Sequence, residues 1–143
     1  QNIDGLHQAA GSRAVLELHG SAHRNVCVGC GRGHGMDFML ATIGVPACLD
    51  CGAMVRPDVV LYGEALDPEV VQGAVEAVSS CDVLVVGGTS LNVYPAAGLV
   101  DLFQGSHLVL VNREATGWDH RADLVVHDSL GEVLGQAVDE LLD

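Results

Sequence analysis

Four of the five cysteines occur as two C-x2-C pairs, and this spacing constrains the fold more than any other feature of the sequence. The pairs are Cys27 with Cys30 and Cys48 with Cys51, separated by residues 31–47. Such pairs form two disulfides, two redox motifs or one zinc site. We predict zinc, because a tetrahedral ion takes four thiolates and neighbouring glycines relax the turns that present them. Four protein ligands leave no position for water or substrate, so the predicted role is structural.

The chain is strongly acidic, with 19 Asp and Glu against six Arg and no Lys, and a formal net charge of −13. Binding to phosphate backbones requires clustered Lys or Arg, so no direct binding to nucleic acid is expected. The charge keeps a domain soluble and would also attract basic peptides.

The length and hydrophobicity favour one packed domain. The chain has 143 residues, of which 49% are hydrophobic. Its apolar runs, residues 83–86 and 108–111 among them, are far shorter than the roughly 20 residues that cross a bilayer. The sequence also lacks the basic and apolar regions of a signal peptide. We therefore expect a cytoplasmic protein with no membrane association.

The hydrophobic pattern predicts an α/β fold. Continuous apolar strands separated by helices are typical of a Rossmann-like parallel sheet with helices on both faces. We expect residues 1–25 and 56–143 to form this domain and residues 26–55 to form a small inserted zinc-binding module. The expected strands or extended segments are residues 15–19, 59–62, 83–86, 108–111 and 124–126, and the expected helices are 36–43, 68–80, 95–103 and 132–142. The inward face of the last helix is predicted to hold Val133, Leu134, Ala137, Val138, Leu141 and Leu142.

Polar residues follow two of the predicted strands. Ligands of such sheets bind beyond the carboxyl ends of the strands. Gly88, Thr89 and Ser90 follow the first buried strand and would offer backbone N–H groups and hydroxyls to a phosphate or ribose. Asn112 and Arg113 follow the second. Because the first turn is not a G-x-G-x-x-G motif, a plain tight turn remains the alternative.

His19 is the histidine whose position best fits a catalytic role. It ends the predicted strand 15–19, precedes Gly20 and is expected to share a face with Glu17. A histidine at such a position would act as a general base. Spacing alone also fits a structural histidine. No role is evident for His23, His34, His107, His120 and His127.

Taken together, these segments resemble the sirtuins, the NAD-dependent protein lysine deacylases. The resemblance covers nearly the whole chain in the order of the family. The matching segments are QNIDGLH at 1–7, ELHG at 17–20, the two C-x2-C pairs, RPDVVLYGE at 56–64, GTSLNVYPAA at 88–97 and VNRE at 111–114.

The resemblance implies a transferase-like deacylation that consumes NAD. The acyl group of an acyl-lysine, acetyl included, would pass to ADP-ribose, giving nicotinamide and O-acyl-ADP-ribose. His19 would be the proton acceptor, and the four cysteines would hold structural Zn2+. The implied partners are acyl-lysine proteins or peptides.

The resemblance also implies the binding residues. Gln1, Asn2 and Asp4 match the nicotinamide and ribose pocket, where an amide and a carboxylate orient the ligand. Gly88, Thr89 and Ser90 match contacts to phosphate and ribose, Asn112 and Arg113 match contacts to the adenosine ribose, and Leu130 matches a contact to adenine. The peptide would add as a strand along residues 59–64, where the matched residues are Val59, Tyr62, Gly63 and Glu64. Tyr62 replaces a Phe that many sirtuins have.

The start of the chain departs from the family. Sirtuins have a glycine-rich strand and turn, a cofactor loop and a helical region before the QNID segment. We therefore expect the chain to be the carboxyl-terminal portion of the catalytic domain, with the Rossmann-like sheet incomplete on its N-terminal side, and to be inactive by itself. The alternatives are an NAD-dependent protein ADP-ribosyltransferase and a non-catalytic zinc-containing interaction module.

Overall fold

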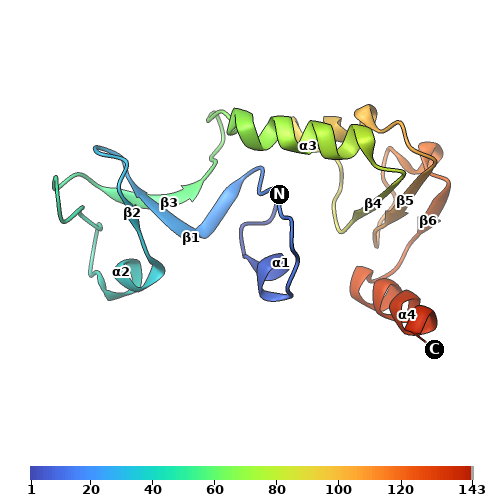
Figure 1. The fold of residues 1–143 in the computed structure, drawn as a ribbon, viewed down its shortest axis with the longest axis horizontal. Coiled ribbons are helices and arrows are strands. Elements are labelled where there is room, and N and C mark those ends of the chain that lie inside the picture. Colours follow the sequence, from blue (N-terminus) through green and yellow to red (C-terminus); the bar gives the residue numbers. More distant parts are fainter. Residues whose placement is uncertain (143) are drawn as a thin grey trace. The chain divides into compact units, whose positions relative to one another are not determined.

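The structure is a computed structural model, which describes residues 1–142 of the chain. It contains two compact units, Gln1–Val71 and Gln72 onward, each with its own three-stranded sheet (Figure 1). Among the described residues no helix has the length and apolar character needed to span a membrane.

The first unit is built on an antiparallel sheet in the order β2-β1-β3. Its small core surrounds Cys27, Cys48 and Val55, with Phe38 and Met39 packed against them. The elements of this unit are α1 (Leu6–Ala9), β1 (Gly20–Cys27), β2 (Gly33–His34), α2 (Met36–Ala41) and β3 (Val55–Val59).

The pairing of β1 with β3 is interrupted in its middle. Ser21 lies opposite Asp58, whereas Asn25 lies opposite Pro57, the preceding residue of β3. Residues 22–24 of β1 therefore have no partner on β3, and we call them the β1 bulge. A bulge redirects side chains locally and ends regular pairing.

The second unit contains the parallel sheet, in the order β4-β5-β6. Its core is apolar and includes Leu91, Ala97, Val100, Leu108 and Leu110. The elements are α3 (Pro68–Ser80), which begins in the first unit, β4 (Val83–Gly87), the 3-10 helix η1 (Ala96–Leu102), β5 (His107–Val111), the 3-10 helix η2 (Asp119–Arg121), β6 (Leu124–Val126) and α4 (Leu130–Leu142).

The predicted α/β class and parallel sheet are confirmed. The helix expected at 68–80 has the predicted bounds, and Asp67 caps it by accepting hydrogen bonds from the N–H groups of Glu69 and Val70 at 2.8 and 3.3 Å. The segment expected at 95–103 is a 3-10 helix, which is more tightly wound than an α-helix.

Two predicted strands are misplaced. Residues 15–19 do not form a strand: the Gly20 N–H donates to the Glu17 carbonyl at 2.9 Å, which closes a turn, and β1 begins only at Gly20. His19 therefore precedes a strand instead of ending one. The extended segment expected at 59–62 lies earlier, because β3 ends at Val59 and Tyr62 is in a turn.

The predicted inward face of α4 is largely exposed. Leu134 and Val138 are 43% and 51% exposed, and Leu141 is 84% exposed. At the start of the helix the side chain of Leu130 lies against Gly87. Amphipathicity marks an apolar side of a helix but does not supply the surface that would cover it.

Candidate functional site

The four paired cysteines converge on one point. Their Sγ atoms all lie within 4.8 Å of one another. The Sγ atoms of Cys27 and Cys51 are 3.4 Å apart, and those of Cys30 and Cys48 are 3.7 Å apart. A tetrahedral zinc ion with Zn–S bonds of about 2.3 Å keeps its sulfurs about 3.8 Å apart. The donor set and its spacing thus fit structural zinc.

Backbone N–H groups lower the pKa values of two of these thiols. The N–H groups of Cys30 and Gly29 lower the pKa of the Cys27 thiol to about 6. The N–H groups of Asp50 and Cys51 likewise lower the pKa of the Cys48 thiol. Zinc binds the thiolate form, so these N–H groups favour the ligating state.

His19 lies in the turn before β1, where its backbone is firmly held. Its carbonyl accepts a hydrogen bond from the Val60 N–H at 3.0 Å, which ties the turn to the chain beyond β3. Its Nδ1 atom is buried and has no hydrogen-bond partner among the described residues. Burial lowers the pKa of the imidazole below 6.5, so the ring is predominantly neutral at pH 7.

The turn depends on a glycine after the histidine. Gly20 has φ +76°, and a Cβ atom there would lie 1.9 Å from the Asp58 carbonyl oxygen. No side chain fits between two backbone segments that approach so closely. Gly20 thereby sets where His19 stands relative to β3.

We expect Gly20→Ala to destabilise the protein by about 3 kcal/mol, because it adds both a left-handed backbone strain and a steric clash. Gly11→Ala is the matched control, since Gly11 also has a positive φ, +86°, but a Cβ atom there would have no neighbouring atom within 4 Å. Urea denaturation of both variants measures the difference. Equal losses of stability in the two variants would show that the close approach of Gly20 to the Asp58 carbonyl adds no cost of its own.

The segment that holds Gln1, Asn2 and Asp4 runs beside β1. The carbonyl of Ile3 accepts a hydrogen bond from the Ala22 N–H at 3.0 Å. The Asp4 carboxylate accepts one from the Leu6 N–H at 3.0 Å, at the start of α1. The structure thus brings the predicted nicotinamide segment to the strand that follows His19.

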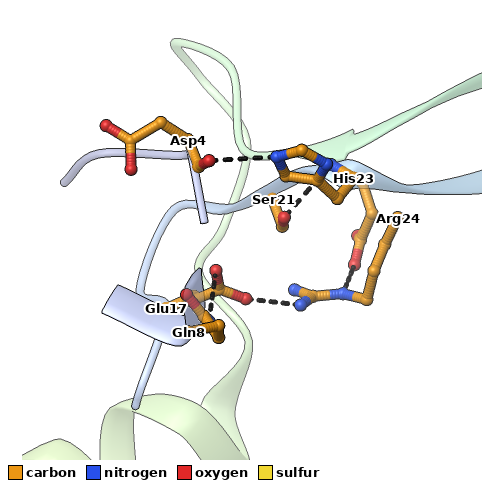
Figure 2. Close-up of polar contacts among 7 residues, drawn as sticks. Asp4, Gln8, Glu17, Ser21, His23 and Arg24 are labelled. Carbon is orange, nitrogen blue, oxygen red and sulfur yellow. Dashed lines mark hydrogen bonds and ion pairs between the residues drawn. The ribbon is translucent and has the colours of Figure 1, made fainter. Parts of the chain in front are cut away.

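Arg24 connects three separate segments around this part of the first unit (Figure 2). It forms an ion pair with Glu17 and donates from Nε to Asp58 Oδ2 at 3.1 Å. Gln8 donates to the other oxygen of Glu17 at 2.9 Å. Arg24 lowers the pKa of Glu17, which keeps this carboxylate charged. The link holds the residues just before His19 against β3.

The predicted peptide segment begins at an edge strand and continues into a turn. Glu64 accepts hydrogen bonds from the Leu61 N–H at 2.9 Å and from Arg56, which also donates to the Val59 carbonyl at 2.7 Å. Arg56 lowers the pKa of Glu64 to about 2. Tyr62, in the turn that Glu64 closes, is fully exposed. The Glu64 carboxylate is thus occupied in holding the turn.

The predicted nucleotide residues of the second unit lie at the carboxyl ends of its strands. The Gly88 N–H donates to the Val111 carbonyl and the Asn112 N–H to the Val126 carbonyl, each at 3.0 Å. Gly88 has φ +63°, a conformation that glycine adopts without strain. Ser90 and Arg113 are exposed.

Leu130 lies beside this turn at the N-terminus of α4. A Cβ atom at Gly87 would lie 2.5 Å from Leu130 Cδ1, so any larger residue there would require the Leu130 side chain to move. The N-terminus of a helix carries partial positive charge and favours anions. We call the turn and the helix start together the strand-end cradle, where the helix N-terminus would favour a phosphate.

Sequence reasoning overlooked three residues that organise these parts. His127 contacts the Asn112 carbonyl through Nδ1 at 3.1 Å and Asp119 through Nε2 at 3.2 Å. His23 contacts the Asp4 carbonyl, and Arg24 holds Glu17. No spacing pattern marks these contacts, because they depend on how turns and strands bring the residues together.

Comparison with known proteins identifies the family whose members have sequences similar to this one. The model of the Sir2 family matches residues 1–95. The NAD-dependent protein deacetylase of Cutibacterium acnes is 60% identical over 134 residues, which cover 94% of this chain and 54% of that protein. The protein of the same name from Clostridium perfringens is 56% identical over 140 residues, covering 97% of this chain and 57% of that protein. The chain thus spans about half the length of the curated relatives it matches.

Solved structures agree with the sequence relatives. A structure of Sir2 with a p53 peptide and NAD+ is 37% identical with a TM-score of 0.91, covering 98% of this chain and 60% of that one. A Sir2 complex with the inhibitor EX-527, 2'-O-acetyl-ADP-ribose and deacetylated p53 peptide has the same identity and TM-score, and covers 98% and 62%. The family model, which matches well over half of the residues, decides the assignment: this chain belongs to the Sir2 family.

Proposed function

We propose that the protein removes acyl groups, acetyl included, from protein lysines and consumes NAD, with nicotinamide and O-acyl-ADP-ribose as products. Two similar proteins bear the name NAD-dependent protein deacetylase. Similar structures are named as complexes with NAD+, acetylated peptide and acetyl-ADP-ribose. A cytoplasmic location remains a prediction.

The observation that carries this proposal is the state of His19. Its imidazole is buried at Nδ1, and burial lowers its pKa, so the ring has a lone pair available at neutral pH. The segment with Asn2 and Asp4 is hydrogen-bonded to the strand that starts next to it. A neutral base just before a strand that holds the segment with these amide and carboxylate residues is suited to taking a proton from a ribose hydroxyl.

The strand-end cradle of the second unit is proposed to bind the nucleotide. When bound, NAD supplies the ADP-ribose group that accepts the acyl group. Gly88, Thr89 and Ser90 would contact phosphate or ribose, and Asn112, Arg113 and Leu130 would contact the adenosine. The nearby start of α4 supports this assignment, because a helix N-terminus offers positive potential to a phosphate.

The acylated peptide is proposed to pair with the chain from Val59 to Glu64. The edge position of β3 supports this, because one side of the strand has no partner in the described sheet. Main-chain pairing at a sheet edge accepts many peptide sequences. The formal charge of −13 would favour peptides with basic residues around the acylated lysine.

The turn that holds Tyr62 and Gly63 provides a test of peptide binding. Glu64→Gln removes the charge that pairs with Arg56 and should loosen the turn. We expect a rise of about fivefold in the KM for an acetylated peptide, with the KM for NAD unchanged. Glu69→Gln, an exposed glutamate in α3, is the control. Unchanged peptide KM in Glu64→Gln would contradict the assignment of this segment.

The proposed function is tested by incubating the whole protein with an acetylated peptide and NAD. Formation of deacetylated peptide and O-acetyl-ADP-ribose in equal amounts supports deacylation. Labelled ADP-ribose attached to protein instead would favour the transferase alternative. A zinc-loaded protein that forms neither product would favour an interaction module.

A further inference from the structure

The β1 bulge, residues 22–24, makes hydrogen bonds to the N-terminal segment, outside the pairing of β1 with β2 and β3. Ala22 donates its N–H to the Ile3 carbonyl at 3.0 Å, and His23 Nε2 lies 2.9 Å from the Asp4 carbonyl oxygen. Two consecutive carbonyls of the N-terminal segment are thus held by two consecutive residues of the bulge. Figure 2 shows the imidazole directed at the Asp4 backbone, while the Asp4 carboxylate points away from the ring.

The segment from Asn2 to Gly5 depends on this attachment, because the helix after it is too short to fix it. Helix α1 has four residues and none of them is buried. Helices of this length are not stable by themselves. The ring of His23 also lies against Gly5, where a Cβ atom would be 3.0 Å from its Cδ2 atom.

The chemistry of the contact defines the role of the imidazole. A carbonyl oxygen only accepts, so Nε2 must carry a hydrogen, which it does both in one neutral tautomer and in the imidazolium form. The backbone of His23 is also held, because its N–H donates to the Ser21 hydroxyl at 3.1 Å. Its neighbour Arg24 forms an ion pair with Glu17. The bulge thus holds one segment before α1 and one after it.

We propose that His23 is a positioning residue, which acts through the Asp4 carbonyl to hold Asn2 and Asp4 in place for the nicotinamide and ribose end of NAD. This inference rests on the proposed function. It assigns a role to a residue outside the segments that the family resemblance implies for the site.

The test compares the whole protein with its His23→Ala and His23→Gln variants, and with His120→Ala as an exposed-histidine control. Loss of one such hydrogen bond should raise the KM for NAD about tenfold in His23→Ala and leave the KM for the acetylated peptide within about twofold. Glutamine has an N–H at similar reach and should restore most of the loss. His120→Ala should behave as wild type.

Hydrogen exchange gives a readout that needs no activity. The Leu6 and Ala9 amides, which donate within the held segment, should exchange about tenfold faster in His23→Ala and at nearly the wild-type rate in His23→Gln. Unchanged exchange and unchanged KM for NAD in His23→Ala would overturn the proposal. Equal rises in both KM values with a lower Tm and no rescue by glutamine would also overturn it. If the wild type lacks deacylase activity, the proposed function fails, and exchange still decides whether His23 holds the segment.

Discussion

Replacing His19 by alanine in the whole protein should lower kcat for deacylation about a thousandfold, the usual cost of removing a positioned general base. The expected loss is large because no other base is evident in the His19 turn: Glu17 is paired with Arg24, and the Asp4 carboxylate accepts the Leu6 N–H. The measurement is a steady-state assay with an acetylated peptide and saturating NAD.

His120→Ala is the control for this variant, because it also removes an imidazole but from an exposed position in η2. It should retain full activity. Zinc content and Tm of His19→Ala should equal those of the wild type. Turnover of His19→Ala within about threefold of wild type would contradict the role of general base.

The pH dependence follows from the direction of the pKa shift. Burial lowers the pKa of His19 below 6.5, and the neutral ring is the form proposed to accept the proton. Activity should therefore be near its maximum at pH 7 and fall only as the pH decreases through this lowered pKa. An acid limb centred above pH 7 in kcat/KM would contradict the assignment, and His19→Ala should lack this limb.

Replacing Cys48 by serine should abolish zinc binding and unfold much of the zinc-binding module, residues 26–55. The buried core here consists of Cys27, Cys48 and Val55, so little apolar surface remains to hold the segment without the metal. Structural zinc contributes about 10 kcal/mol or more to the folding of small modules. Metal analysis and hydrogen exchange of this segment measure the two effects.

Cys81→Ser is the matched control, because Cys81 lies outside the cluster and its thiol donates to the Val78 carbonyl. It should retain zinc at the wild-type level, about one equivalent per chain. Less than about half an equivalent in undamaged wild-type protein would count against the four-cysteine site.

Local sequence patterns predicted the elements correctly where the signals lie in neighbouring residues. The helix at 68–80 carries its cap at Asp67 in the sequence itself, and β6 has the predicted bounds because a short apolar run is bounded by polar residues. The strand expected at 15–19 was wrong because alternation alone does not reveal the turn that Gly20 closes with Glu17. The inward face of α4 was wrong because amphipathicity does not say how much sheet is available to cover a helix.

The sequence by itself determined the metal site, the parallel sheet and the family resemblance, because all three depend on residue types at fixed short spacings. Tertiary structure alone decided that His19 precedes β1, that Arg24 holds Glu17, and that His23 holds the Asp4 carbonyl. These contacts depend on the register of β1 against β3 and on the bulge within it. Register is set by packing and turn geometry over the whole sheet, so no local pattern contains it.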